Sequence, residues 1–257
     1  MDLTARQAEV SDLLRQEEFI TVESLAERFD ITTQTVRRDI NALCDFGQAR
    51  RKHGGVESIS SGGNLAYGTR QVLNRVAKRA IAKHAAKVIP NGSSISLGIG
   101  TTPEMVMRAL LKHNDLKIYT NNLAIAKIAS SNPEFGVYCS GGRVRSSDMD
   151  MLGSSVKVFF DSYKTDFGIY SAGGVDIDGE LLDFSDKEVQ IRRAILDNCR
   201  ESFLVLDHEK FGRSAHVRGG QIQEANKIFC DQRPSNEICQ ILSDSESELI
   251  ICEKEEL

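Results

Sequence analysis

The first 58 residues carry the hydrophobic pattern of three short helices. Apolar residues recur at helical spacing from Leu3 to Glu17, again after Thr21, and again after Thr32. Thr4, Thr21 and Thr32 each stand where a hydroxyl can accept an unpaired N–H of a first helical turn, and Gly47 suits the end of the third helix. The pattern therefore predicts three helices that close on one small core.

Two features around the third helix predict a DNA-binding module. The short connection Asp30-Ile31-Thr32 before it is typical of a helix-turn-helix, whose second helix enters the major groove. After it, residues 48–57 read Gln-Ala-Arg-Arg-Lys-His-Gly-Gly-Val-Glu, which are two extended stretches about a Gly-Gly corner. This hairpin is interpreted as a wing, so we expect residues 1–58 to form a winged helix-turn-helix.

The outward face of the third helix is polar throughout. Arginine can bond guanine edges, glutamine and asparagine can bond adenine edges, and threonine can reach phosphates or a thymine methyl. The alternative is a solvated helix face with no ligand, but the basic wing beside it favours DNA. The candidate DNA-binding residues are Thr33, Gln34, Thr35, Arg37, Arg38, Asn41, Arg50, Arg51, Lys52 and His53.

Residues 59–69 are rich in glycine and serine and predict a flexible linker. The stretch from Arg70 to Val88 then predicts one basic amphipathic helix, which Pro90-Asn91-Gly92 ends. A basic helix can touch DNA or a membrane, but its apolar stripe favours a helix that packs on its own domain. We therefore expect a second domain over residues 70–257.

From residue 94 the chain alternates strand and helix, which predicts an α/β fold with an open parallel sheet covered on both faces. The predicted strands are Ser94–Ile99, Leu116–Thr120, Gly136–Cys139, Asp166–Ser171, Ser202–Leu206, Lys227–Cys230 and Glu248–Cys252. The predicted helices are Glu104–Lys112, Leu123–Ser130, Ser154–Phe160, Asp186–Cys199 and Asn236–Leu242.

The first predicted strand runs into a loop of small residues, Gly-Ile-Gly-Thr-Thr-Pro, over residues 98–103. Thr102 is the expected cap and Pro103 the expected first residue of the next helix. Free N–H groups at the start of a helix bind anions, although many such turns are only structural. The loop has neither a Walker A sequence nor G-x-G-x-x-G. It predicts a phosphate site on Gly100, Thr101 and Thr102.

Other predicted strands also end in polar residues, cations or glycines. The carboxyl ends of parallel strands share one crevice, so we expect these segments to converge. Cations and carboxylates beside a phosphate loop suit a phosphorylated sugar or polyol, although each residue alone is more often a turn or a surface charge. The further candidate effector-binding residues are Asn121, Gly141, Gly142, Arg143, Arg145, Asp176, Glu188, Lys210 and Arg213.

The charge distribution supports the DNA-binding interpretation. The formal net charge is −5, but the last 14 residues alone carry −5, so the rest of the chain is neutral. From Gln34 to His53 five cations face two acids. With 40% hydrophobic and 27% charged residues, the composition is that of an ordinary globular protein and excludes disorder, collagen and coiled coil.

The six cysteines lie singly, without a C-x-x-C pair or histidines at zinc spacing. They predict small buried thiols, no metal and no cofactor. No stretch has the length and apolar character of a signal peptide or a membrane span. Unpaired cysteines in an unexported chain indicate a reducing compartment, so we expect a cytoplasmic protein with no membrane partner.

Six motifs together are typical of one family. They are Thr33-Gln34-Thr35-Val36-Arg37-Arg38-Asp39-Ile40-Asn41, Arg51-Lys52-His53-Gly54-Gly55, Ile99-Gly100-Thr101-Thr102, Thr120-Asn121-Asn122, Gly141-Gly142-x-x-Arg145 and Asp207-x-x-Lys210-Phe211-Gly212-Arg213. Nearly end to end, the chain resembles the DeoR family of bacterial sugar-responsive repressors, and within it the group of glycerol-3-phosphate regulon repressors. Gly98 departs from the family pattern, in which an aspartate is common at this position.

The resemblance implies a repressor of a carbohydrate or polyol catabolic operon. It implies a winged helix-turn-helix joined to a sensor domain related to ribose-5-phosphate isomerase, which releases operator DNA on binding a phosphorylated effector, with glycerol 3-phosphate favoured. It also implies a homo-oligomer, dimer or tetramer. One recognition helix reads only a few base pairs, so paired half-sites independently favour at least a dimer.

The same kinship supplies an alternative function, a catalytically active sugar-phosphate isomerase. Such isomerases use an acidic stretch, a glycine-rich loop with a lysine, and a glutamate for proton transfer. Asp176, Asp178 and Glu188 are similar acids, but residues 177–186 contain no lysine and no glycine-rich loop. A DNA-binding module has no purpose on a plain enzyme, so we expect a regulator without catalytic residues.

Overall fold

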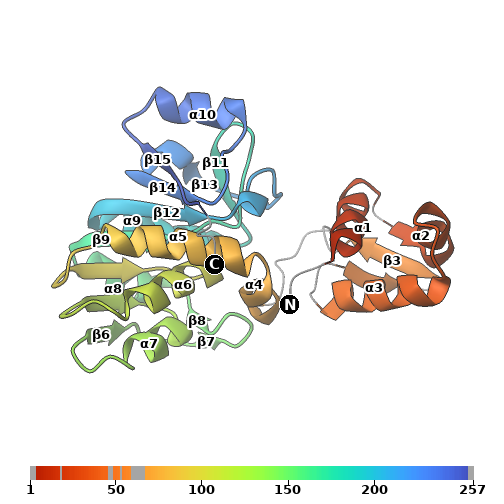
Figure 1. Ribbon diagram of the computed structural model, residues 1–257. Helices are drawn as coiled ribbons and strands as arrows, with labels where there is room; N and C mark the ends of the chain where they lie inside the picture. The colour runs from red at the N-terminus through yellow and green to blue at the C-terminus, as the bar shows by residue number, and fades with distance from the viewer. Residues whose placement is uncertain (1–3, 18, 46–48, 53, 59–66, 254–257) are drawn as a thin grey trace. The chain divides into compact units, whose positions relative to one another are not determined.

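The computed structural model describes residues 4–17, 19–45, 49–52, 54–58 and 67–253 (Figure 1). The chain divides into two compact units, Met1–Leu73 and Asn74–Leu257.

The first unit contains the three expected helices and a small sheet. The caps form as expected: the hydroxyls of Thr4, Thr21 and Thr32 accept the N–H of the third residue after each, at 3.1 to 3.3 Å. The elements are α1 (Ala5–Gln16), β1 (Phe19–Thr21), α2 (Val22–Arg28), α3 (Thr33–Asp45), β2 (Ala49–Lys52), β3 (Gly55–Ser58) and α4 (Tyr67–Val72).

The antiparallel strands β2 and β3 form the wing, and β1 pairs with β3 as a third strand. Gly55 is required at the crossing of β1 and β3, because a Cβ there would lie 2.3 Å from the carbonyl oxygen of Ile20. Leu25, Leu43 and Val56 are fully buried in one core shared by the helices and the sheet. The predicted winged helix-turn-helix is confirmed.

The second unit is built on the predicted parallel sheet, in the order β15-β14-β12-β9-β4-β5-β6. Its strands are β4 (Ser94–Leu97), β5 (Lys117–Thr120), β6 (Gly136–Cys139), β9 (Thr165–Tyr170), β12 (Cys199–Leu206), β14 (Lys227–Cys230) and β15 (Glu248–Ile251). Its helices are α5 (Arg75–Lys87), α6 (Thr101–Leu110), α7 (Leu123–Ala129), α8 (Ser154–Asp161), α9 (Asp186–Asp197) and α10 (Asn236–Ser243).

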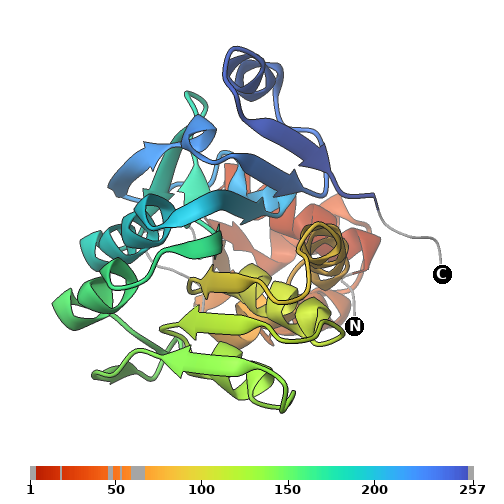
Figure 2. The ribbon, with the colours of Figure 1, turned by 90° about the vertical axis from the view of Figure 1, so that its left-hand side faces the viewer.

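Helices cover both faces of this sheet (Figure 2). One apolar core lies between the sheet and α5, α6 and α7, and a second lies between the sheet and α8, α9 and α10. The register aligns the strands, with Leu97 opposite Thr120, Thr120 opposite Cys139 and Leu206 opposite Cys230. The segments that follow these strands therefore begin at one edge of the sheet.

The basic helix predicted from Arg70 to Val88 is wrong in one respect, since it is two helices, α4 and α5. Asn74 separates them with a φ of 51°, a left-handed conformation that ends the first helix and cannot continue into the second. Residues 59–66 of the predicted linker lie outside the described residues, and residues 67–69 belong to α4.

Two small antiparallel sheets lie outside the predicted pattern. One contains β10 (Gly174–Val175), β11 (Glu180–Asp183) and β13 (Val217–Gln221), and the other pairs β7 (Val144–Arg145) with β8 (Asp150–Met151). These strands are short and rich in glycine and charge, so they lack the apolar alternation that identifies a strand.

The cysteine prediction holds only in part. Cys199, Cys230 and Cys252 are buried free thiols, whereas Cys139 is exposed on the edge strand β6. Burial raises the pKa of the Cys230 thiol to about 12, which leaves it unreactive at neutral pH. The described part of the chain has neither a group of residues able to hold a metal ion nor a helix long and apolar enough to cross a membrane.

Candidate DNA-binding face and effector site

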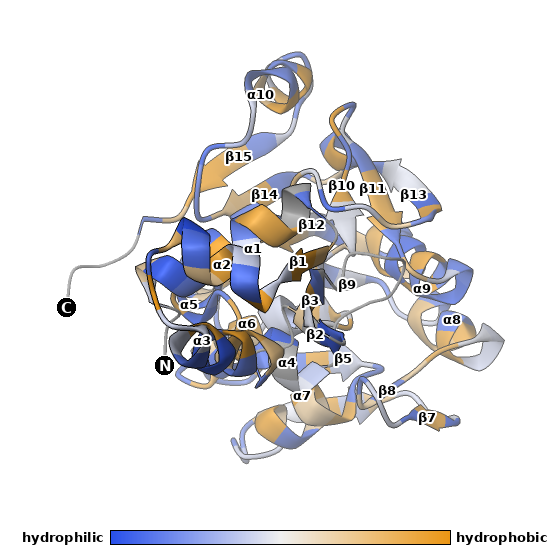
Figure 3. Cartoon of the chain, turned by 90° about the vertical axis from the view of Figure 1, so that its right-hand side faces the viewer, coloured by the Kyte–Doolittle hydropathy of each residue, from blue (hydrophilic) through white to orange (hydrophobic). Residues whose placement is uncertain are grey.

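Helix α3 presents the polar face that the sequence predicts (Figure 3). Thr35 is half-buried, and its hydroxyl lies 3.0 Å from that of Thr32, just before the helix. The remaining candidate residues of the helix are exposed; they are Thr33, Gln34, Arg37, Arg38 and Asn41. The buried stripe of Val36, Ile40 and Leu43 directs this polar face away from the core.

A residue that the sequence argument missed holds α3 in place. Asp39 is 6% exposed and accepts hydrogen bonds from Arg6 Nε at 2.6 Å and from Gln7 Nε2 at 3.1 Å, both on α1. The bond to Asp39 raises the pKa of the Arg6 guanidinium. The sequence does indicate this role, because Asp39 is three residues after Val36 and so falls on the buried stripe of α3. A buried carboxylate needs a hydrogen-bonding partner.

The wing is less positive than its sequence suggests. Lys52 Nζ lies 3.1 Å from Glu57 Oε2 across the hairpin and 5.7 Å from the centre of the Phe19 ring. Arg51 is an exposed cation of β2. Two candidates cannot be placed, because His53 and the side chain of Arg50 lie outside the described residues.

In the second unit, the predicted phosphate loop leads directly into α6. The helix begins at Thr101 with Gly100 as its cap, so the expectation of a Thr102 cap and Pro103 as first residue is wrong. Gly100 has a φ of 123°, which allows the chain to enter the helix two residues earlier. The backbone N–H groups of Thr101 and Thr102 have no acceptor within the helix, because the N–H groups of a first helical turn never do.

Two predicted cations lie beside the segment that follows β9, the strand next to β4 in the sheet. Lys210 Nζ and Arg213 Nη1 are 3.5 Å and 3.3 Å from the carbonyl oxygen of Gly173. A Cβ at Gly100 would lie 3.9 Å from Cβ of Ser171, which is two residues from Gly173 along the chain. The start of α6, which follows β4, and the Lys210–Arg213 segment, which follows β12, thus lie at the carboxyl edge of the sheet on either side of the segment that follows β9.

Asn121 follows β5 at the same edge and is fully buried. Its Nδ2 donates to the carbonyl oxygen of Met151 at 2.7 Å, and its Oδ1 has no hydrogen-bond partner among the described residues. A buried acceptor without a donor is costly, so this oxygen is suited to a ligand hydroxyl.

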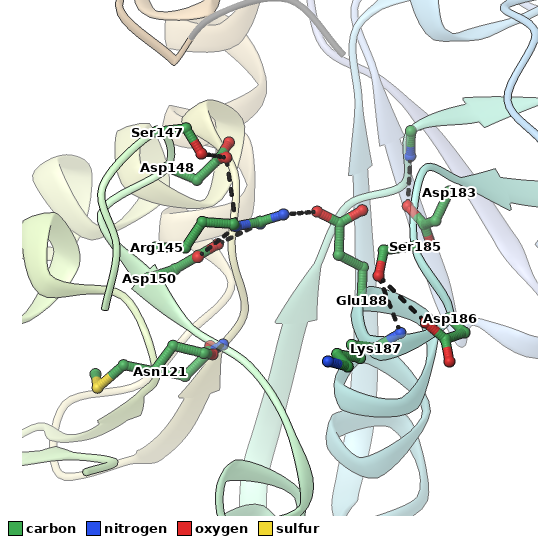
Figure 4. Close-up of polar contacts among 12 residues, drawn as sticks. Asn121, Arg145, Ser147, Asp148, Asp150, Asp183, Ser185, Asp186, Lys187 and Glu188 are labelled. Carbon is green, nitrogen blue, oxygen red and sulfur yellow. Dashed lines mark hydrogen bonds and ion pairs between the residues drawn. The ribbon is translucent and has the colours of Figure 1, made fainter. Parts of the chain in front are cut away.

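Arg145 does not face solvent as a free cation. Its guanidinium group lies between Asp150 on β8 and Glu188 on α9 (Figure 4). Arg145 Nη2 is 2.8 Å from Asp150 Oδ2, and Arg145 Nη1 is 2.7 Å from Glu188 Oε1. Asp148 Oδ2 is 3.4 Å from its Nε. Burial raises the pKa of Asp150, and the Arg145 guanidinium opposes that rise. Arg145 and Glu188, both predicted effector contacts, thus bind one another.

A small pocket lies beside Glu188, lined in part by Gly98, Ser171, Asp183 and Arg192. Arg192 Nη2 binds Asp183 Oδ2 at 2.9 Å, and Asp183 Oδ1 accepts the N–H of Gly173 at 2.8 Å. A Cβ at Gly98 would lie 3.1 Å from Cδ1 of Ile195. A side chain at position 98 would therefore require a small shift of Ile195.

The other four predicted effector residues are exposed on loops and turns. Asp176 is exposed in the turn between β10 and β11, where its own Oδ1 accepts the N–H of Ile177 at 2.8 Å. Asp178 Oδ1 likewise accepts the N–H of Glu180. Both acids thus accept hydrogen bonds within the turn, whereas Glu188 binds Arg145. The loop after β6 exposes Gly141, Gly142 and Arg143.

Comparison with known proteins covers both units. Residues 6–62 match the model of the DeoR-like helix-turn-helix domain, and residues 73–232 match that of the DeoR C terminal sensor domain. The chain is 38% identical over 252 residues to the glycerol-3-phosphate regulon repressor of Escherichia coli, covering 98% of this chain and all of that one. It is also 38% identical to the HTH-type transcriptional repressor CsqR of Escherichia coli, over 93% of this chain and 92% of that one.

Among solved structures, ribose 5-phosphate isomerase A from Methanocaldococcus jannaschii matches 55% of this chain and 56% of its own, with 18% identity and a TM-score of 0.40.

Proposed function

Since the chain belongs to the DeoR family of transcriptional repressors, we propose that its sensor unit binds a phosphorylated polyol or sugar, and that this effector releases the protein from operator DNA. The repressor binds DNA through its winged helix-turn-helix. The single observation that carries the effector proposal is that α6 and the Lys210–Arg213 segment follow the parallel strands β4 and β12, both neighbours of β9, at the same edge of the sheet.

In this proposal the Thr101 and Thr102 amides and the dipole of α6 bind the phosphate, because a helix N-terminus favours an anion. Lys210 and Arg213 neutralise the second negative charge, and Asn121 Oδ1 accepts a ligand hydroxyl. Glycerol 3-phosphate is the first candidate, because a relative that is 38% identical over nearly the whole chain is named for its regulon.

Replacing Thr101 by glutamate is expected to abolish stabilisation by glycerol 3-phosphate, because the carboxylate repels the phosphate. At a hundred times its Kd the ligand should stabilise the wild type by about 2.7 kcal/mol, measured by thermal shift. If it binds the DNA-free state ten times better, operator affinity falls by about 1.4 kcal/mol at saturation. Lys210→Met, which removes one cation without filling the loop, should weaken the same response.

The matched control is Asn236→Glu, which places the same carboxylate in the first position of α10. This variant should respond to glycerol 3-phosphate as the wild type does. Equal stabilisation of Thr101→Glu, or no stabilisation of the wild type by any phosphorylated sugar or polyol, contradicts the proposed site.

We propose that the protein is not an enzyme. The acids that resemble those of an isomerase are dispersed, since Asp176 and Asp178 stabilise a turn while Glu188 is bound to Arg145. Incubation with ribose 5-phosphate should leave the sugar unchanged. Rapid conversion to its isomer would show that the protein is a sugar-phosphate isomerase. We place the protein in the cytoplasm, where a repressor meets DNA and where free thiols persist.

We further propose a homo-oligomer, because one α3 reads one half-site and repressor affinity requires two. Light scattering at micromolar concentration should give at least twice the 28.4 kDa mass of one chain. A monomer that retains full operator affinity would rule the oligomer out.

A further inference from the structure

Helix α5 has one face in the core and one face that is strongly basic. Ala77, Ala80, Ile81, Ala85 and Ala86 are buried, and Figure 1 shows the helix lying along the sheet. The opposite face exposes cations at every fourth position. They are Arg75, Arg79, Lys83 and Lys87, which we call the α5 stripe.

The α5 stripe lies in a segment from which acidic residues are missing. Between Glu57 and Glu104 the sequence contains no aspartate or glutamate, although the protein as a whole has more acids than bases. Glu104 is itself buried and bound to Arg108 at 2.7 Å. Lys78, on the other side of α5, lies 3.9 Å from the buried Asp207.

All three of Arg75, Arg79 and Lys87 are exposed, and none of them forms an ion pair with a residue that the structure describes. With a rise of about 1.5 Å per residue, cations four residues apart recur about every 6 Å along the helix. Arg75 and Lys87 are therefore about 18 Å apart along the axis and, at 3.6 residues per turn, about 120° apart around it; a DNA duplex carries about ten phosphates over that length.

Two polyanions, a membrane surface and DNA, could in principle bind the α5 stripe, and the structure favours DNA. A helix that lies in a membrane surface needs an apolar face free to enter the lipid, but the apolar face of α5 is occupied by the core. DNA requires only cations, and the chain joins α5 to the DNA-binding unit through α4. A phosphate backbone close to the operator is therefore the partner that this face fits.

We propose that the α5 stripe binds backbone phosphates of the DNA that flanks the operator core, which gives the sensor unit a sequence-independent DNA contact of its own. The proposal rests on operator binding by α3 and adds a second surface to it. Effector release then has to break contacts of both units with the DNA.

The test replaces Arg75, Arg79 and Lys87 by glutamine in the full-length protein. The matched control makes the same replacement by glutamine at three other exposed cations of the second unit, Lys127, Lys164 and Arg233. Two duplexes carry an operator selected from random-sequence DNA by the wild type: one contains the core alone and the other adds ten base pairs on each side. Kd is measured for each from 50 to 200 mM salt.

For the flanked duplex, the slope of log Kd against log salt should fall by about 2 to 3 per subunit in the stripe variant, at roughly 0.9 per phosphate contact. The core duplex and the control variant should give wild-type slopes. Unchanged slopes for the flanked duplex, or equal losses on both duplexes, overturn the proposal. If the wild type selects no operator, operator binding by α3 fails instead.

A membrane partner gives a different result. In that case the wild type binds phosphatidylserine vesicles, the stripe variant does not, and the DNA slopes of the two proteins agree; this outcome also overturns the proposal. Circular dichroism melting of all three proteins shows that the six replaced side chains leave the fold intact.

Discussion

Replacing Arg145 by alanine is expected to destabilise the sensor unit by about 3–5 kcal/mol, because it leaves buried carboxylates without their counter-ion. The Asp150 side chain is fully buried and Glu188 is 7% exposed, and Arg145 binds both. Urea unfolding followed by tyrosine fluorescence measures the effect, since four of the five tyrosines lie in this unit and the chain has no tryptophan.

The loss should depend on pH in a defined direction. Burial raises the pKa of Asp150, and an acid whose pKa is higher in the folded state lowers stability as the pH rises through that pKa. Without Arg145 the pKa rises further, so the variant loses more stability at pH 7.5 than at pH 5. Exposed Lys157, paired with Asp161 on α8, provides the control. Its alanine variant should change stability by less than about 1 kcal/mol.

A destabilisation of Arg145→Ala below about 1 kcal/mol at pH 7.5, or a larger one at pH 5, would show that the Arg145 network does not stabilise the unit. In that case Arg145 and Glu188 would again be available to an effector, as the sequence argument expected.

The DNA-binding unit could be predicted from sequence because its determinants are local. Helix caps such as Thr21, the buried stripe of α3 and the Gly-Gly corner each act within a few residues of the chain. The parallel sheet was predicted for a related reason. Strands that are buried on both faces appear in the sequence as short apolar runs. When such strands are parallel, their carboxyl ends lie at the same edge of the sheet.

The candidate effector site was harder to predict because charge pairing is not local. Arg145 and Glu188 are 43 residues apart in sequence, and only the fold shows that they neutralise one another. The same holds for Asp39, which binds α1 through residues more than 30 positions away. Asp176 is a third example, because an aspartate in a turn can accept a backbone N–H as readily as a ligand hydroxyl, and here it accepts that of Ile177.

Replacing Arg37 and Arg38 together by alanine is expected to remove most sequence-specific binding. Each arginine that bonds a base edge contributes about 1–3 kcal/mol, so the pair should weaken operator binding by at least tenfold. Both side chains are exposed on α3 and lie outside the core of the first unit, so the variant should fold normally.

Two single variants separate base recognition from general attraction. Arg28→Ala removes an exposed arginine of α2 that is paired with Glu17, and should bind the operator as the wild type does. Lys52→Ala removes a wing cation, and should weaken operator and random DNA alike while reducing the salt slope by about one.

The most direct test of sequence-specific DNA binding by α3 is the ratio of operator Kd to random-DNA Kd at one fixed salt concentration, for the wild type and for the Arg37→Ala, Arg38→Ala double variant. We expect the preference for the operator to fall at least tenfold in the variant, with random-DNA binding changed much less. An operator preference that survives the loss of both arginines would contradict the assignment of α3 as the recognition helix.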